Sequence, residues 1–276
     1  MFTLNCKGRI LVVDKPLVMG VINVTPDSFY AGSRFGTINE TLKQAELMLK
    51  EGAAILDMGG QSTRPGSERV TVEEELKRLV PPLQTLAREF PESFISVDTY
   101  YSAVAKEAVE SGASIVNDIS AGTIDPQMIQ VVASMGVPYV LTHMKGNLET
   151  MHIQAAYENP TREVLDFFIF KIAELTKAGI ADLVIDPGFG FGKTIQHNLE
   201  ILKNLSLFKI LDLPVLAGLS RKSTIYKTLG IGADESLNGT TVLNTLALLN
   251  GANMLRVHDV KEARQVITLL ERYQTA

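Results

Sequence analysis

The sequence predicts a (β/α)8 TIM barrel, an α/β fold in which helices cover a ring of eight parallel strands. Three observations predict it. Eight short apolar runs recur along the 276 residues, helical patterns separate these runs, and each run is apolar on both faces. Parallel strands that are covered from both sides have this property. A doubly wound open sheet is the alternative, because its strands and helices alternate in the same way.

Each predicted strand is an apolar run followed by a polar or glycine-containing loop. The eight runs are 17–25 (LVMGVINVT), 54–60 (AILDMGG), 94–100 (FISVDTY), 114–120 (SIVNDIS), 138–144 (PYVLTHM), 183–190 (LVIDPGFG), 215–220 (VLAGLS) and 253–259 (NMLRVHD). Before them, the segment FTLNCKGRILVVDKP has alternating apolar residues around CKG. Because the first barrel strand begins only near Leu17, we expect this segment to form a β-hairpin that plugs the barrel floor.

Helical patterns occupy the intervals between the strands. The clearest are 71–90, 125–136, 161–179 and 238–252. The first has Thr71 as its expected N-cap and Glu74 as the capping-box partner, and the second stops at Gly136. The last, NGTTVLNTLALLNGA, reads as a helix that is buried nearly all round. No linker rich in Gly, Ser or Pro divides the chain, so we expect one domain over residues 1–276.

Composition excludes several classes of protein. Hydrophobic residues make up 46% and charged residues 21%, as in ordinary globular proteins. The net charge of −5, with no run of Lys or Arg longer than two, argues against nucleic-acid binding. No apolar stretch is long enough to span a membrane, and the first residues lack a signal-peptide pattern. Cys6 is the only cysteine, which excludes an intrachain disulfide, so we expect a cytoplasmic protein.

Polar residues gather at the ends of the predicted strands, whereas the strand interiors are apolar. They are Asn23, Asp57, Asp98, Asn117, Asp118, His143, Asp186, Lys222, Arg256 and His258. A single acid at a strand end is as often a helix N-cap as a functional group. In a TIM barrel, however, the carboxyl ends of all strands meet in one basin, where the active site lies. The presence of many polar residues at strand ends that converge therefore favours a binding site there.

These residues are of two chemical kinds. The first kind offers hydrogen-bonding groups without positive charge: Asp98, Asn117 and Asp186. Such groups suit a heterocycle rich in N–H donors, for example an amino-pyrimidine edge. The second kind suits an anion such as diphosphate, with an amide oxygen that can hold a hard cation: Arg256, His258, Asn23 and the loop with Thr63 and Arg64. The pattern thus indicates a heterocycle that carries a diphosphate leaving group.

Two other motifs fail on spacing. GFGFGKT (188–194) resembles a phosphate-binding loop, but Pro187 occupies the position where that loop requires glycine. We interpret it as a glycine-rich turn that lets the backbone approach a ligand closely. The four histidines lack the spacing of metal ligands and have no cysteine beside them, so a structural zinc site is not expected.

Eight motifs, taken together, resemble those of the dihydropteroate synthases of the folate pathway. In order they are MGVINVTPDSF, LDMGGQSTRPGS, SVDT, VNDIS, THMKG, DPGFGFGKT, GLSRKS and RVHD. The resemblance extends from about Leu17 to the C-terminus, and the motifs fall at the family's strand positions. One such motif alone is a weak signal, whereas eight in the family's order are highly specific. Ala31 departs from the pattern, since the family usually has Asp there.

The resemblance implies a reaction and a role for each matching residue. In that reaction 4-aminobenzoate displaces diphosphate from 6-hydroxymethyl-7,8-dihydropterin diphosphate and gives 7,8-dihydropteroate. The residues implied to hold or line the pterin are Asp98, Asn117, Asp186, Lys222, Met144, Phe191 and Gly218. Those implied to hold diphosphate, with Mg²⁺ at the first, are Asn23, Arg256 and His258. Those implied to surround the aminobenzoate are Thr63, Arg64, Pro65, Phe29 and Ser223. The main catalytic contribution would come from Lys222, Arg256, His258 and Asp98.

The resemblance also implies Mg²⁺ as cofactor, inhibition by sulfonamides and a homodimer. Two alternatives remain. A pterin-dependent methyltransferase shares the barrel, but the pairing of STRPG with SRKS argues against it. A non-catalytic pterin-binding module is the other, and the presence of Lys222, Ser223, Arg256 and His258 argues against that.

Overall fold

The barrel is present and closed. The structure is a computed structural model and describes residues 1–24, 34–61, 69–146 and 155–276. Within these residues, eight parallel strands form one sheet in the order β8-β7-β6-β5-β4-β3-β10-β9. A parallel bridge between Ile185 and Val215 joins the two ends of this sheet. This bridge excludes the doubly wound alternative, in which the sheet stays open.

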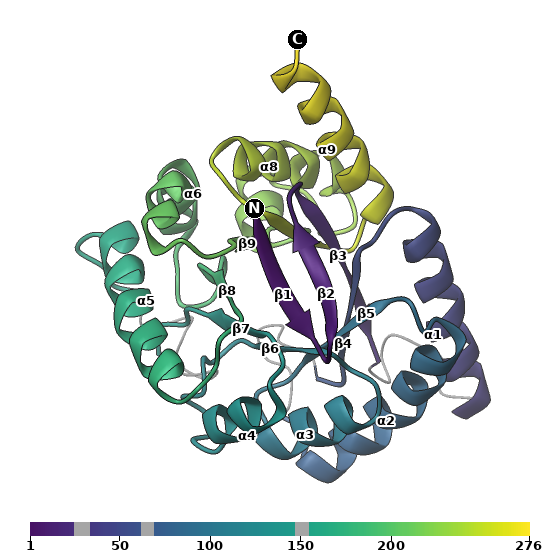
Figure 1. The fold of residues 1–276 in the computed structure, drawn as a ribbon. Helices are drawn as coiled ribbons and strands as arrows, with labels where there is room; N and C mark the ends of the chain where they lie inside the picture. Colours follow the sequence, from purple (N-terminus) through teal and green to yellow (C-terminus); the bar gives the residue numbers. More distant parts are fainter. Residues whose placement is uncertain (25–33, 62–68, 147–154) are drawn as a thin grey trace.

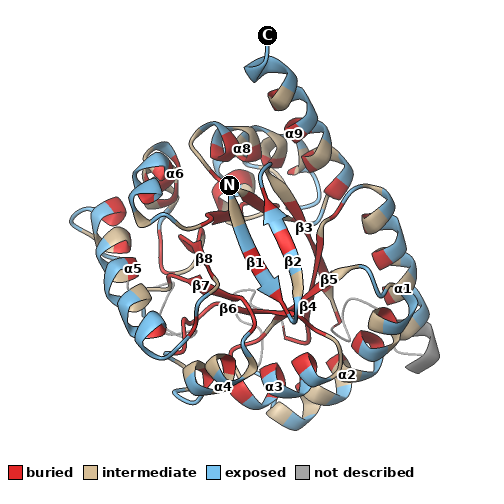
Figure 2. Cartoon of the chain, in the orientation of Figure 1, coloured by how far each residue is buried: buried red, intermediate tan, exposed pale blue. Residues whose placement is uncertain are grey.

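Helices surround the ring of strands (Figure 1). The strands are β3 (Leu17–Asn23), β4 (Ile55–Gly59), β5 (Phe94–Asp98), β6 (Ile115–Asp118), β7 (Tyr139–Thr142), β8 (Leu183–Asp186), β9 (Leu216–Ala217) and β10 (Met254–Val257). The helices are α1 (Arg34–Lys50), α2 (Val72–Glu89), α3 (Ser102–Glu110), α4 (Met128–Met135), α5 (Pro160–Lys177), α6 (Ile195–Lys203), the 3-10 helix η2 (Leu205–Leu211), α7 (Ser223–Leu229), α8 (Leu237–Leu249) and α9 (Val260–Gln274). Figure 2 shows the strands buried and the outward helix faces exposed, which explains the apolar strand runs.

Local signals set several helix ends. Thr71 caps α2, because its hydroxyl accepts from the Glu74 N–H at 3.3 Å. The Glu74 carboxylate pairs with Arg78 on the next turn, at 2.8 Å. Gly136 ends α4 in the left-handed conformation, with φ of 60°, which glycine adopts without a steric penalty. Both predicted helix ends are confirmed, but the Glu74 side chain pairs with Arg78 and does not complete the predicted capping box.

The N-terminal hairpin plugs the barrel floor, as predicted. Its strands, β1 (Phe2–Cys6) and β2 (Arg9–Val13), are antiparallel and lie across the ring in Figure 1. Its buried side chains are Leu4, Cys6, Leu11 and Val13, and they pack with residues of seven barrel strands. Burying each of the aliphatic ones contributes about 1.5–3 kcal/mol, so the plug is a substantial part of the core.

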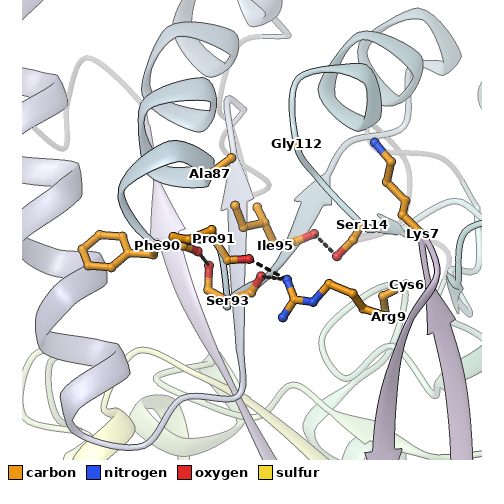
Figure 3. A pocket seen from close by; sticks show the side chains of 10 residues that line it. All are labelled: Cys6, Lys7, Arg9, Ala87, Phe90, Pro91, Ser93, Ile95, Gly112 and Ser114. Carbon is orange, nitrogen blue, oxygen red and sulfur yellow. Dashed lines mark hydrogen bonds between the residues drawn. The ribbon is translucent and has the colours of Figure 1, made fainter.

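Two cations clamp this hairpin at the floor. The Arg9 guanidinium donates to the carbonyls of Pro91 at 2.7 Å and Ser93 at 3.2 Å, just beyond α2. Lys7 Nζ donates to the carbonyl of Val109 in the last turn of α3, at 2.7 Å. Cations are favourable at the C-terminal ends of helices. The small pocket between these groups (Figure 3) therefore lies beside the hairpin, at the floor and away from the carboxyl ends of the strands.

Helix α8 corrects one expectation from the sequence. It is not buried all round: Val242, Leu246 and Leu249 are 50%, 41% and 49% exposed. The side chains that it buries are Thr240, Asn244, Ala247 and Leu248. The helix is apolar on its outward face as well, so composition alone could not tell the two faces apart. In the part of the chain that the structure describes, no helix is long and apolar enough to cross a membrane.

Candidate active site

Arg256 lies in a hydrogen-bonded group of side chains from four strands at the carboxyl end of the barrel. Its Nε donates to Asp57 Oδ2 at 2.6 Å, and its Nη2 bonds to Asp98 Oδ2. Asn117 Nδ2 donates to the same Asp57 oxygen at 3.1 Å. These residues come from β10, β4, β5 and β6. The guanidinium is therefore held between two carboxylates, and its orientation is set before any ligand binds.

Asp57 is the site residue that the sequence interpretation left without a role. Its side chain is fully buried, and its Oδ1 has no hydrogen-bond partner among the described residues. Buried polar atoms are almost always paired, so an unpaired acceptor beside a cluster of charges is a candidate contact for a ligand donor. The available signal was a carboxylate inside the otherwise apolar run AILDMGG.

The carboxylate of Asp98 has an altered acidity. Burial raises its pKa to about 7, an effect that Arg256 opposes and that the negative charge of Asp57 reinforces. The pKa of Arg256 is raised by its two carboxylate partners in spite of burial, so it stays cationic. Burial and the shared guanidinium therefore act in opposite directions on the pKa of Asp98.

A second charged group lies around Gly218, next to Arg256. A Cβ built on Gly218 would lie 3.6 Å from Asp186 Oδ2 and 3.7 Å from Lys222 Nζ. Asp186 Oδ1 accepts from the Gly188 N–H at 2.8 Å, which leaves Oδ2 to face the ammonium. Burial raises the pKa of Asp186 and lowers that of Lys222 to about 8. The positive charge of Lys222 partly offsets the rise at Asp186, and the negative charge of Asp186 partly offsets the fall at Lys222. A side chain at Gly218 would enter the space that these two groups share.

The loop after β8 supplies the aromatic ring of the site, Phe191. Lys222 Nζ donates to the carbonyl of Phe189 and lies 4.6 Å from the centroid of the Phe191 ring. A Cβ at Gly188 would come within 1.9 Å of the His143 carbonyl oxygen, so only glycine fits there. The sequence predicts this turn as an approach of the backbone to a ligand, whereas the structure shows that Gly188 is required by the close approach of the loops after β7 and β8.

Lys193, the lysine of the failed phosphate motif, fixes this loop from behind. Its buried ammonium donates to the carbonyls of His143, Gly188 and Phe191 at 3.0–3.1 Å, and its distance to His143 Nδ1 is 2.8 Å. Burial lowers the pKa of both Lys193 and His143 far below their ordinary values. Lys193 is therefore a support for Phe191 and is not exposed to a phosphate, and His143 is neutral.

His258 is exposed and is oriented by Ser220. The Ser220 Oγ accepts from the His258 backbone N–H at 3.2 Å and lies 3.0 Å from its Nδ1. Ser220 thus orients the imidazole at the rim of the site.

Comparison with known proteins agrees with this arrangement. A model of the pterin binding enzyme family matches residues 19–258. A dihydropteroate synthase of Escherichia coli (strain K12) is 43% identical over 270 residues, which is 97% of this chain and 95% of the relative. The chain belongs to the dihydropteroate synthase family.

Solved structures of dihydropteroate synthases have the same fold over their whole length. One from Xanthomonas albilineans with 4-aminobenzoic acid has a TM-score of 0.93 at 39% identity and covers 99% of this chain and 98% of that one. One from Yersinia pestis in a sulfonamide drug complex has a TM-score of 0.93 at 38% identity and covers 100% of both chains.

Most of the dihydropteroate synthase residues predicted from the sequence lie together at the barrel mouth. Those in the two charged groups are Asp98, Asn117, Asp186, Phe191, Gly218, Lys222 and Arg256. Asn23 ends β3, Met144 lies two residues after β7, and Ser223 begins α7, and all three are half-buried. The positions Phe29, Ala31, Thr63, Arg64 and Pro65 lie outside the described residues.

Proposed function

We propose that this chain condenses 6-hydroxymethyl-7,8-dihydropterin diphosphate with 4-aminobenzoate, giving 7,8-dihydropteroate and diphosphate. The observation that carries the proposal is the barrel mouth itself. Buried carboxylates able to accept from a heterocycle lie directly beside a guanidinium and an ammonium. Family membership over nearly the whole chain supports the same reaction.

The pterin ring would lie between the two charged groups. The ring carries several N–H donors, and the acceptors on offer are the free Oδ1 of Asp57 and the carboxylates of Asp98 and Asp186. Lys222 would donate to a ring acceptor, and the Phe191 ring, which already contacts that ammonium, would line the pocket. A buried carboxylate without a donor is unfavourable, so ring binding would satisfy groups that are costly to leave unpaired.

The diphosphate would lie toward Arg256 and His258. Asn23 offers one oxygen for a cation, and among the described residues no group of three His, Cys, Asp or Glu side chains could hold a metal. This donor set fits Mg²⁺ as an ion shared between Asn23, water and the substrate's own phosphates. When bound, the ion would neutralise charge on the leaving diphosphate.

The aminobenzoate side rests on residues of the first two loops and on Ser223. Phe29, Thr63, Arg64 and Pro65 would enclose the aromatic amine, and Ser223 would meet its carboxylate. The Xanthomonas albilineans and Yersinia pestis relatives were solved with 4-aminobenzoic acid and with a sulfonamide drug. A sulfonamide, which mimics the aminobenzoate, would compete for the same place here.

The chemistry needs little acid–base help from the protein. The C–O bond to diphosphate breaks, the amine nitrogen bonds to the same carbon, and the amine loses one proton. The electron-rich ring can stabilise positive charge as diphosphate leaves, so a dissociative path suits it. Arg256 and His258 would stabilise the departing negative charge, and the carboxylates around the ring would stabilise the developing positive charge. The neutral aromatic amine is already a nucleophile and needs mainly positioning.

The test is incubation of the chain with both substrates and Mg²⁺, followed by detection of dihydropteroate and diphosphate. Equal amounts of both products are expected. Methyl transfer to an acceptor without diphosphate release would identify a methyltransferase, and pterin binding without turnover would identify a binding module. Either result would refute the proposal.

We also propose that the enzyme is a cytoplasmic homodimer. The outward side chains of α8 are Val242, Leu246 and Leu249, an apolar row that a second copy would cover. Cys6 is buried and unpaired, which is compatible with a reducing compartment. Light scattering on the chain and on a Leu246→Lys variant tests the dimer: the variant should be monomeric, and a monomeric parent chain would refute it.

A further inference from the structure

Three consecutive residues after β9 reach three different parts of the site. Ser220 bonds to His258, as described above. Lys222 points the other way, to the carbonyl of Phe189 and toward Asp186. Between them, Arg221 points out of the site and bonds to Asp259, the residue that follows His258. The tripeptide is therefore anchored to His258 at one end, to the loop after β8 at the other and, in its middle, to Asp259 in the loop after β10.

Arg221 has a conformation that its side chain must stabilise. Its φ is +55°, in the left-handed region that is unfavourable for residues other than glycine. Its guanidinium forms two bonds to Asp259, with Nε–Oδ2 at 2.9 Å and Nη2–Oδ1 at 2.7 Å. Nη1 donates to the Asp234 carbonyl at 3.0 Å, and the backbone N–H donates to Thr240 Oγ1 at 3.0 Å. These bonds offset the backbone strain.

Asp259 is committed to the same contact. It occupies the N-cap position of α9, where an Asp side chain ordinarily accepts from the first turn. Here its side chain makes no cap hydrogen bond, and both carboxylate oxygens accept from Arg221. A favourable helix cap is thus replaced by a bidentate pair that joins the loops carrying Lys222 and His258.

We propose that Arg221 and Asp259 are positioning residues that hold Lys222 and His258 at fixed places in the site, an inference that rests on the proposed function. The left-handed residue turns the chain so that Ser220 faces His258 while Lys222 faces Asp186. The pair joins the groups for the ring to the groups for the diphosphate, and neither partner needs to touch a substrate. Loss of the pair lowers turnover by misplacing both groups at once.

The variants Arg221→Lys and Asp259→Asn each remove the bidentate pairing with little change in size. Each should lower kcat/KM for the pterin diphosphate by about 10–100-fold, the size expected when a reacting group is misplaced by a fraction of an ångström to 1 Å. The double variant should be no worse than either single one, because the two residues act as one unit. Affinity for a dihydropterin without diphosphate, which does not need His258, should fall less than turnover.

A matched control comes from the surface pair Arg162–Asp166 on α5, which is 79% and 53% exposed with Nε and Oδ2 3.7 Å apart. Arg162→Lys and Asp166→Asn should leave kcat/KM unchanged. The variant Arg221→Gly separates backbone from side chain, since glycine adopts positive φ without strain. It should fold and still lose turnover.

The alkaline limb of the pH profile is the readout that a merely structural role would not move. Lys222 faces Asp186, Arg256 and Asp98, and burial holds its pKa at about 8. A loosened loop admits water, so the limb should move to higher pH in Arg221→Lys and Asp259→Asn. Calorimetric unfolding of each variant shows whether it is folded.

If the wild-type chain makes no dihydropteroate, the proposed function is refuted, and this outcome is distinct from a failure of the Arg221–Asp259 pairing. Active wild type overturns the positioning role if both single variants keep kcat/KM within twofold, if Arg221→Gly keeps full turnover, or if losses multiply in the double variant. A turnover loss that matches the fraction of unfolded protein in every variant also overturns it.

Discussion

Asp57→Asn removes one negative charge from the base of the site and keeps the size of the side chain. Asp57 Oδ2 accepts from Arg256 and Asn117, whereas Oδ1 has no partner among the described residues. The new amide keeps both bonds only if its oxygen takes the Oδ2 position. Its NH2 group then occupies the buried Oδ1 position, where the structure describes no acceptor.

Two effects set the magnitude. Hydrogen bonds to a charged group contribute about 1.5–3 kcal/mol against about 0.5–1.5 kcal/mol for neutral ones, so neutralising this acceptor costs about 1–1.5 kcal/mol. A buried NH2 group without an acceptor costs about 1–3 kcal/mol more. Arg256 keeps Asp98 as a partner, which limits the loss. The expected decrease in the free energy of unfolding is about 2–4 kcal/mol, or about 4–10 °C in Tm for a chain of this length.

The assay combines calorimetric unfolding with titration of a dihydropterin that lacks diphosphate. Affinity for that ligand should also fall, because a ring N–H would face an amide N–H in place of a carboxylate oxygen. Asp118→Asn is the matched control. Asp118 is equally buried, but it accepts from Ser120, Gly122 and Tyr139 and has no bond to Arg256. The control should lose stability without a change in pterin affinity.

Unchanged Tm and unchanged pterin affinity in Asp57→Asn would refute the reasoning, because both the paired and the free oxygen would then be without consequence. A loss of stability alone would restrict Asp57 to holding Arg256.

Three further outcomes are expected from the proposed function. Asp186→Asn should weaken binding of the bare pterin by about 2–4 kcal/mol, since a buried acceptor of ring donors becomes partly a donor; calorimetry that finds equal affinity contradicts this role. Burial lowers the pKa of Lys222 to about 8, so kcat/KM should fall as pH rises through 8, because the ammonium loses its proton. The contribution of Lys222 to the free energy of unfolding should rise between pH 8 and 10.5, because in that range only the unfolded chain keeps this lysine protonated. Arg256 and Asp98 stay charged there, and a profile that is flat to pH 10 excludes a protonated Lys222 as ring donor. Arg64→Ala should raise the KM for 4-aminobenzoate more than that for the pterin diphosphate, and steady-state kinetics with equal increases would remove Arg64 from the aminobenzoate side.

The fold was predictable because its signals are local. Apolar runs of strand length, separated by helical patterns, predict β3 to β10, and the caps at Thr71 and Gly136 depend on residues within one helical turn. The rule that active sites lie at the carboxyl ends of barrel strands then brings Asp98, Asn117 and Arg256 to one basin. Motif order added the family, since eight motifs in one order are specific where a single motif is not.

The pairings within that basin were decided by the tertiary structure alone. Asp57 and Arg256 are separated by 199 residues in the chain, and a hydrogen bond of 2.6 Å between them requires that the barrel closes with both side chains at the same height. Local periodicity carries no information on such distances. For the same reason the sequence could reject Lys193 as part of a phosphate-binding loop but could not show that it is a buried support of the loop after β8. It also could not show that α8 leaves an apolar face uncovered, because burial depends on what lies opposite a helix and composition reports only what the helix itself contains.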